Sequence, residues 1–202
     1  MARKNARKMW ADHVAGRGGK PRAVDTRAFV GKKPYDGLVL GIDPSLRGTG
    51  LAALDFSSGQ PTLKASRTVK LKPKLPFDVC LGEIHQAVVS YLEEWKPRHV
   101  AIEQTIYVQN FQTAQVLGAA RGAVIAAAAV RGIPVFEYPP LRIKQAVVGF
   151  GRASKEQVAR TVAQLLSSGE ELGFDEADAV GAAFCHAMTW TGEEVIREAI
   201  ST

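Results

Sequence analysis

The stretch Leu38-Val39-Leu40-Gly41-Ile42-Asp43 decides the fold, because an unbroken apolar run ends there on a single carboxylate. A run of this length, bounded by turn residues, predicts a strand buried on both faces in the middle of a sheet. Pro44 follows at once and opens an expected turn that ends at Gly50. Asp43 is therefore expected at the carboxyl end of a central strand, where open α/β sheets form their active crevices.

The segments around this strand predict the rest of an α/β domain. Short connections make the first three expected strands an antiparallel meander, and helices then alternate with two further strands. This pattern predicts a five-stranded mixed sheet of order 3-2-1-4-5 flanked by helices, which is the ribonuclease H-like architecture. The other expected strands are 51–56, 62–71, 99–103 and 133–138, and the expected helices are 77–95, 110–130, 141–148, 154–166 and 175–190.

Three further acids share the setting of Asp43. Glu103 ends the run Val100-Ala101-Ile102, and Asp175 and Asp178 lie three residues apart on one face of the last expected helix. Singly, each has a plainer interpretation as a turn residue, a strand-end ion-pair partner or a helix cap. Together, costly acids from three remote segments predict one metal cluster, because a hard divalent cation compensates buried carboxylates.

The expected metal is Mg²⁺, with Mn²⁺ as a substitute, and the expected chemistry is phosphoryl transfer. Two ions about 4 Å apart can activate a water and stabilise the leaving oxygen of an in-line displacement. Asp43 is the expected ligand of both ions. Glu103 and either Asp175 or Asp178 complete the two shells, and the pairing of acid with ion stays open.

The positive charge of the chain is concentrated at its N-terminus. Residues 1–36 contain 10 Lys/Arg and 3 Asp/Glu, whereas residues 37–202 contain 16 and 17. We expect a flexible basic tail over 1–36, a nuclease domain over 37–192 and a helix extension or frayed end over 193–202. Such a tail either contacts nucleic acid or acts as a solubilising extension. Two distant cysteines and no long apolar segment predict a cytoplasmic protein with no membrane span.

Several short stretches, in this order and spacing, closely resemble the RuvC-type Holliday-junction resolvases over roughly residues 37–190. They are Gly41-Ile42-Asp43-Pro44 with Thr49-Gly50, Ala101-Ile102-Glu103-Gln104, Leu117-Gly118-Ala119-Ala120-Arg121-Gly122, Pro134-Val135-Phe136-Glu137-Tyr138, Lys144-Gln145-Ala146-Val147-Val148-Gly149 and Asp175-Glu176-Ala177-Asp178-Ala179. The resemblance implies a homodimeric, Mg²⁺-dependent endonuclease. It implies symmetric nicking of two opposed strands of a four-way DNA junction, with a branch-migration helicase complex as a further partner.

The chain departs from this family at three places. Ser45 stands where the family usually has glycine, and the basic tail is not a family feature. The family places an aromatic residue three positions after the glutamate, where this chain has Ile106. Tyr107 or Phe111 is the candidate to stack on DNA in its place.

Basic residues supply the remaining candidates for the site. Lys144 and Lys155 match basic positions near the family's active site, where a lysine can bind the scissile phosphate or stabilise its developing charge. A solvated surface lysine is the plainer interpretation of each. Four arginines are candidate phosphate contacts, and they are Arg47, Arg121, Arg142 and Arg152.

The helix expected over 110–130 is the candidate dimer contact. Its stretch from Gln115 to Ala123 is rich in small residues, which let helices approach closely. Packing on the sheet is the alternative use of such residues. A two-fold dimer suits paired nicks, because it brings two identical active sites to one junction.

Three other functions remain open at this stage. An actin-like or sugar-kinase-like ATPase shares the architecture, but this chain has no room for a second phosphate-binding lobe. A non-catalytic junction-binding module would use the acids only structurally. A phage-type debranching nuclease would act on forks and flaps, with the tail raising its affinity for any branched DNA.

Overall fold

The predicted strands form one sheet in the computed structural model, which describes residues 35–105, 110–166 and 172–192. The strands are β1 (Leu38–Asp43), β2 (Gly48–Asp55), β3 (Thr62–Lys70), β4 (His99–Glu103) and β5 (Val135–Tyr138). Their order across the sheet is β3-β2-β1-β4-β5. β1 runs antiparallel to β2 and parallel to β4. The predicted ribonuclease H-like topology is confirmed.

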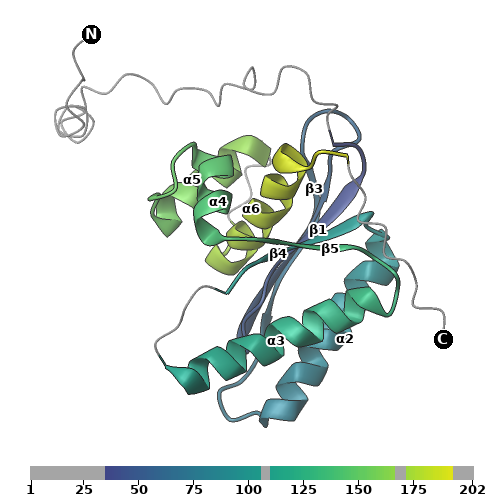
Figure 1. Ribbon diagram of the computed structural model, residues 1–202, viewed down its shortest axis with the longest axis vertical. Coiled ribbons are helices and arrows are strands. Elements are labelled where there is room, and N and C mark those ends of the chain that lie inside the picture. The colour runs from purple at the N-terminus through teal and green to yellow at the C-terminus, as the bar shows by residue number, and fades with distance from the viewer. Residues whose placement is uncertain (1–34, 106–109, 167–171, 193–202) are drawn as a thin grey trace, which may run out of the picture. The chain divides into compact units, whose positions relative to one another are not determined.

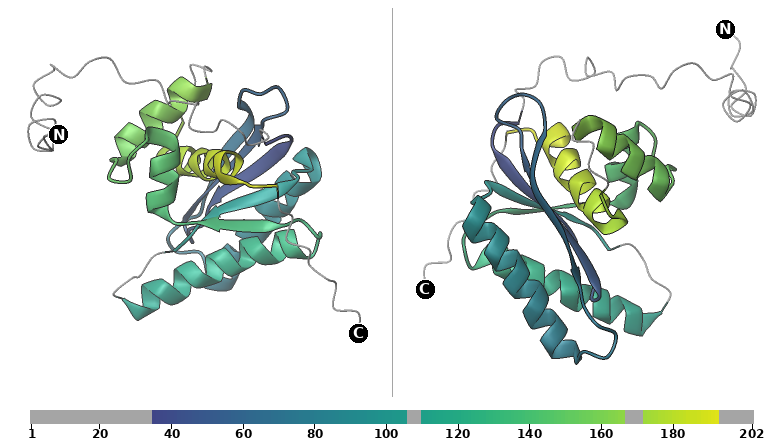
Figure 2. Two further views of the ribbon diagram at one scale, coloured as in Figure 1. Left: turned by 45° about the horizontal axis from the view of Figure 1, so that its top comes forward. Right: turned by 180° about the vertical axis from the view of Figure 1, so that it is seen from behind.

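Helices cover both faces of this sheet (Figures 1 and 2). One side carries α2 (Phe77–Trp95) and α3 (Phe111–Ala129). The other side carries α4 (Pro140–Val148), α5 (Lys155–Leu166) and α6 (Phe174–Thr189). α6 packs directly on β1 and β2, and α4 and α5 pack on α6. Within the described ranges, no helix combines the length and apolar character needed to cross a bilayer.

The alternation of side chains along β1 divides the core into two parts. Val39 packs in the cluster formed with α4, α5 and α6. Leu40 and Ile42 pack in the cluster formed with α2 and α3. β1 is buried on both faces for this reason, and Asp43 at its end is only partly buried. The layered packing thus brings one acid to the boundary between core and solvent.

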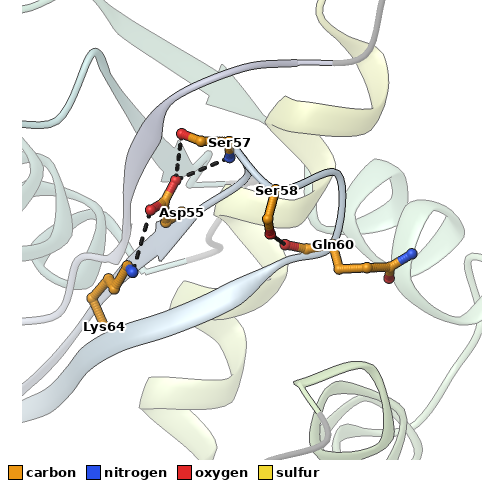
Figure 3. Close-up of polar contacts among 5 residues, drawn as sticks. All are labelled: Asp55, Ser57, Ser58, Gln60 and Lys64. Carbon is orange, nitrogen blue, oxygen red and sulfur yellow. Dashed lines mark hydrogen bonds and ion pairs between the residues drawn. The ribbon is translucent and has the colours of Figure 1, made fainter.

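The β2–β3 hairpin is closed by polar contacts among its own residues (Figure 3). The backbone N–H and the hydroxyl of Ser57 donate to Asp55 Oδ1 at 3.0 and 2.7 Å, and Lys64 Nζ lies 3.3 Å from Asp55 Oδ2. The Ser57 bonds, with a smaller contribution from Lys64, lower the pKa of Asp55. Asp55 pairs with Leu38, at the opposite end of β1 from Asp43. These hairpin contacts therefore lie at the end of the sheet away from the acids.

β2 begins earlier than predicted, at Gly48 and not at 51. Gly48, Thr49 and Gly50 resemble a turn in the sequence, but they pair with Lys70, Val69 and Thr68 of β3. The turn after β1 is correspondingly short, and its side chains close it. Thr49 Oγ1 donates to the Ser45 carbonyl at 2.5 Å, and the Gly48 N–H donates to Ser45 Oγ at 3.1 Å. Ser45, the departure from the family glycine, thus locks the turn that follows Asp43.

Two predicted helix starts are confirmed by their capping bonds. The Asn110 side chain accepts hydrogen bonds from the N–H groups of Gln112 and Thr113 at the start of α3. Ser154 Oγ accepts from the Gln157 N–H at 3.3 Å, and Gln157 Oε1 accepts from the Ser154 N–H at 2.8 Å. This reciprocal pair is a capping box, and it places Lys155 in the first turn of α5.

A buried polar chain anchors α6 to the sheet. His186 of α6 is fully buried, and its Nδ1 lies 2.7 Å from the Tyr138 hydroxyl of β5. Its Nε2 lies 2.8 Å from His99 Nδ1 of β4, which is also 3.0 Å from the Tyr35 hydroxyl. Tyr35 is only 5% exposed and belongs to the core, although the sequence prediction assigned it to the tail. These buried polar contacts hold in place the helix that carries Asp175 and Asp178.

We predict that His186 makes the fold sensitive to acid. Burial, followed by the nearby charges of His99 and Arg98, lowers its pKa to about 3 from an ordinary value of 6.5. The unfolded chain therefore binds a proton that the folded chain refuses, so stability is complete above pH 6.5 and falls as the pH drops towards 3. The loss approaches ~1.4 kcal/mol per pH unit in this window. Urea unfolding of the wild type and of His186→Gln, measured from pH 8 to pH 4, checks it. Parallel pH dependences in the two proteins would contradict the assignment.

Candidate active site

The ends of two adjacent parallel strands bring Asp43 and Glu103 together. Ile42 of β1 pairs with Ile102 of β4, so the next residue of each strand is an acid at the same edge of the sheet. Neighbouring strands are about 4.8 Å apart. Both side chains leave the sheet on the side of α6, because alternate positions, such as Val39 and Ala101, pack in the α6 cluster. The predicted pairing of these two acids follows from the register alone.

α6 brings Asp175 and Asp178 to the same edge, because glycines let its backbone touch the strands. A Cβ placed on Gly50 of β2 would lie 1.9 Å from the Asp175 carbonyl oxygen. A Cβ on Gly41 of β1 would lie 2.0 Å from the Ala179 carbonyl oxygen. Real Cβ atoms do not approach oxygen so closely, so neither position accepts any larger residue without moving the helix. The glycines therefore determine how far the helix acids stand from the strand acids.

The third acid of this helix turn, Glu176, serves a different purpose. Its Oε2 accepts from Ser66 Oγ at 2.9 Å, and its Oε1 accepts from Thr68 Oγ1 at 3.2 Å. Both donors belong to β3. Glu176 therefore ties α6 to the edge of the sheet, away from Asp43 and Glu103.

Three of the four predicted acids line one pocket of about 320 Å³. They are Asp43, Glu103 and Asp178, and the predicted Lys144 and Lys155 line the same pocket. Asp175 does not contribute to its wall, and its Oδ2 lies 3.0 Å from the place that a Gly48 Cβ would take. The wall also includes residues that the sequence prediction did not assign to the site, namely Pro44, Gln104, Thr105, Leu117, Pro140, Ile143 and Val158. Most follow the strand acids directly or face them from helices, and no pattern in the sequence marks them.

The negative charge of the acids in this pocket is not balanced by the cationic side chains around them. Burial raises the pKa of Asp43 to about 7, and the charges of Asp178 and Asp175 add to the effect. Burial also raises the pKa of Glu103 to about 7, followed by Asp43 and Asp178. Lys155 opposes both shifts, and its Nζ lies 3.3 Å from Asp178 Oδ2. Two half-buried acids with pKa values near 7 indicate a site that a cation completes.

The donor set suits a hard divalent cation. Every acid in the pocket offers carboxylate oxygens, with no thiol or imidazole among them. In the described part of the chain, no three acidic, histidine or cysteine side chains stand close enough together to form a finished chelate. Mg²⁺ does not need one, because it usually takes one or two carboxylates and keeps waters or phosphate oxygens as its other ligands. The residues present therefore fit such an ion.

Two of the predicted DNA-contacting arginines are bonded to other residues of the protein. Arg47 donates hydrogen bonds to the carbonyl oxygens of Lys72 and Leu75 at 2.6 and 3.0 Å. Arg121 forms an ion pair with Glu137 of β5, and its Nε is buried. Their guanidinium groups have protein partners, which a sequence pattern cannot reveal. We therefore assign both a structural role.

The other predicted DNA contacts are exposed or lie outside the described residues. Arg142 and Arg152 are exposed on α4 and on the loop before α5. Phe111 is 74% exposed at the start of α3. Tyr107 lies outside the described residues. Of these candidates, the described residues Arg142, Arg152 and Phe111 do not line the pocket.

We predict that Gly50→Ala destabilises the fold. The added methyl would overlap the Asp175 carbonyl, and overpacking of this kind typically costs about 1–3 kcal/mol. Gly82→Ala is the matched control, because a Cβ at Gly82 of α2 meets no atom within 4 Å. Alanine there should stabilise the helix by up to ~1 kcal/mol. Urea unfolding of the two variants measures the difference, and equal midpoints would show that α6 is not held at backbone contact.

Comparison with known proteins agrees with this geometry. Residues 39–186 match the family model described as crossover junction endodeoxyribonuclease RuvC. RuvC of Burkholderia pseudomallei (strain 668) is 46% identical over 149 residues, which cover 74% of this chain and 82% of that protein. RuvC of Pelotomaculum thermopropionicum is 36% identical over 161 residues, covering 79% and 98%.

Solved structures give the same result. Thermus thermophilus RuvC in complex with a Holliday junction substrate has a TM-score of 0.71 and 34% identity, covering 75% of this chain and 93% of that one. The yeast mitochondrial Holliday junction resolvase Ydc2 shares the fold, with a TM-score of 0.55 and 13% identity over 91% of this chain and 92% of that one. With its strand-end acids, its sheet order and these relatives, the chain belongs to the RuvC family of crossover junction endodeoxyribonucleases.

Proposed function

We propose that this protein resolves four-way DNA junctions by symmetric nicks in two opposed strands. One observation carries the proposal: Asp43, Glu103 and Asp178 line one pocket at the carboxyl ends of adjacent parallel strands. The chain is a metal-dependent nuclease by family, and its relative from Thermus thermophilus has been solved with a Holliday junction substrate. The ATPase, the non-catalytic module and the debranching nuclease are not favoured by these relationships.

The acids are the proposed ligands of two Mg²⁺ ions, which Mn²⁺ can replace. Asp43 would be a ligand of both ions, and Glu103 and either Asp175 or Asp178 would complete their shells. When bound, the metal supplies an activated water and charge stabilisation for the leaving 3′-oxygen. The protein contributes the rigid strand ends and the glycine-limited position of α6, which keep the carboxylates aligned with little reorganisation.

Lys144 and Lys155 are the proposed phosphate-binding residues of the site. Both line the pocket, and the side chain of Lys155 is 62% exposed although it pairs with Asp178. An exposed ammonium can turn towards a phosphate while the helix start holds its backbone in place. The charge of Asp178 raises the pKa of Lys155, which favours the protonated form of the lysine.

A homodimer through α3 is the proposed assembly, because paired nicks need two active sites. Gly118 and Gly122 lie on α3, and a Cβ at either position meets no atom of the described chain within 4 Å. A glycine-lined helix face without a covering element can accept the same face of a second copy. A branch-migration helicase complex is a further proposed partner.

We predict that Asp43→Asn abolishes junction cleavage but leaves junction binding intact. The substitution keeps the size of the side chain and removes a metal-binding charge, so the cleavage rate should fall by at least ~10²-fold. A nicking assay on synthetic four-way DNA with Mg²⁺, and binding measured in chelator, separate the two effects. Glu176→Gln is the control, because Glu176 bonds β3 and does not line the pocket. Loss of binding together with cleavage in Asp43→Asn would make Asp43 structural.

We also predict that the basic segment before the domain sets the salt dependence of DNA binding. All ten Lys/Arg of residues 1–36 lie within 1–33, and a cut after residue 33 spares the buried Tyr35. Removal of 1–33 should flatten the slope of log affinity against log salt, because each lost phosphate contact lowers it by about 0.9. A variant of equal length with these basic residues changed to glutamine separates charge from length. An unchanged slope would reduce the segment to a spacer.

Cleavage of forks and flaps as fast as four-way junctions would favour the debranching nuclease.

A further inference from the structure

The segment that joins β3 to α2 carries unpaired positive charge. Residues 70–76, Lys-Leu-Lys-Pro-Lys-Leu-Pro, form what we call the basic loop, which includes the last residue of β3. Lys70, Lys72 and Lys74 are exposed. Within the described residues, none of their ammonium groups has an ion-pair or hydrogen-bond partner. Three cations on so short a segment form a concentrated positive charge that no acid in the described part of the chain pairs with.

The basic loop is held in one shape by Arg47. One guanidinium nitrogen of Arg47 donates to the Lys72 carbonyl at 2.6 Å and to Cys80 Sγ at 2.9 Å. The other donates to the Leu75 carbonyl at 3.0 Å. The backbone adds a bond from the Leu71 N–H to the Arg47 carbonyl, and the Leu75 N–H closes a turn on the Lys72 carbonyl. Pro73 in that turn stiffens it further.

The loop lies at the same end of the sheet as the acids. Asp43 of β1 pairs with Gly50 of β2, which pairs with Thr68 of β3. Two strand spacings make about 10 Å across the sheet, and the loop begins two residues after Thr68. Lys144 and Lys155 line the pocket from helices that follow β5 at the other edge of the sheet. Positive groups thus flank the acids on both sides, as a polyanion that crosses the pocket requires.

We propose that the basic loop binds the sugar-phosphate backbone of a DNA arm beside the strand that is cut, and that Arg47 is the positioning residue that holds the loop for it. The inference rests on the proposed function and adds a second contact surface to it. Free ammonium groups on a rigid backbone suit phosphates at low entropic cost and carry no base recognition. The loop therefore contributes affinity and orientation, and not sequence preference.

The test compares two double variants of equal charge. Lys72→Gln with Lys74→Gln removes two cations from the loop. The control, Lys64→Gln with Lys96→Gln, removes two exposed lysines from the other end of the sheet, where Lys64 pairs with Asp55 (Figure 3). Binding to a synthetic four-way junction is measured in chelator over a salt series, so that chemistry plays no part. The loop variant should lose about two from the slope of log affinity against log salt, and the control should lose none.

The outcomes separate this inference from the proposed function. Wild-type protein that neither binds nor cleaves the junction defeats the proposed function itself. Wild-type protein that binds and cleaves, with a loop variant of unchanged slope, overturns the loop contact alone. Equal losses in the loop variant and in the control also overturn it, because general charge would then explain both.

Arg47→Lys tests the positioning role, since it keeps the charge and loses the forked donor. It should weaken junction binding in the wild-type background and have no further effect when Lys72 and Lys74 are already glutamine. A purely structural loss, or a direct contact of Arg47 with DNA, would weaken binding equally in both backgrounds. Thermal unfolding of each variant confirms that the compared proteins are folded.

Discussion

The contact between the backbone of α6 and the glycines of the two central strands is the constraint on which the site depends. Gly41 and Gly50 let carbonyl oxygens of the helix lie where any side chain would collide with them. Because the helix is this close, its acids reach the edge at which β1 and β4 present theirs. His186, buried between β4 and β5, fixes the other half of the same helix. The sheet therefore fixes the relative positions of the three remote segments that build the site.

That geometry places several carboxylates together with too few cationic side chains to balance them. Burial, followed by the charges of neighbouring acids, raises the pKa of Asp43 and of Glu103 to about 7, and Lys155 offsets only part of this effect. A divalent cation would supply the missing positive charge, and phosphate oxygens of DNA would be among its other ligands. This charge imbalance is the reason for our proposal that the pocket holds metal and a DNA phosphate.

The parts of this account that depend on apolar runs were predictable from the sequence. Buried strands leave continuous hydrophobic segments, so the sheet order and the ends of β1 and β4 followed directly, with Asp43 and Glu103 at them. Partners formed through the tertiary fold leave no such trace. Arg47 and Arg121 resemble exposed DNA contacts in the sequence, yet each is bonded within the protein. Gly48 to Gly50 resemble a turn for a similar reason. Their glycines make room for Asp175 of α6 and do not form a turn.

The most direct test of the central claim is the position of metal in the protein bound to DNA. Crystals of the complex with a four-way junction, grown with Mn²⁺ in place of Mg²⁺, would show the ions by their anomalous scattering. We expect manganese between the carboxylates of Asp43, Glu103 and the α6 acids, in contact with a phosphate of the junction. Manganese bound elsewhere, with these carboxylates contacting only protein or water, would contradict it.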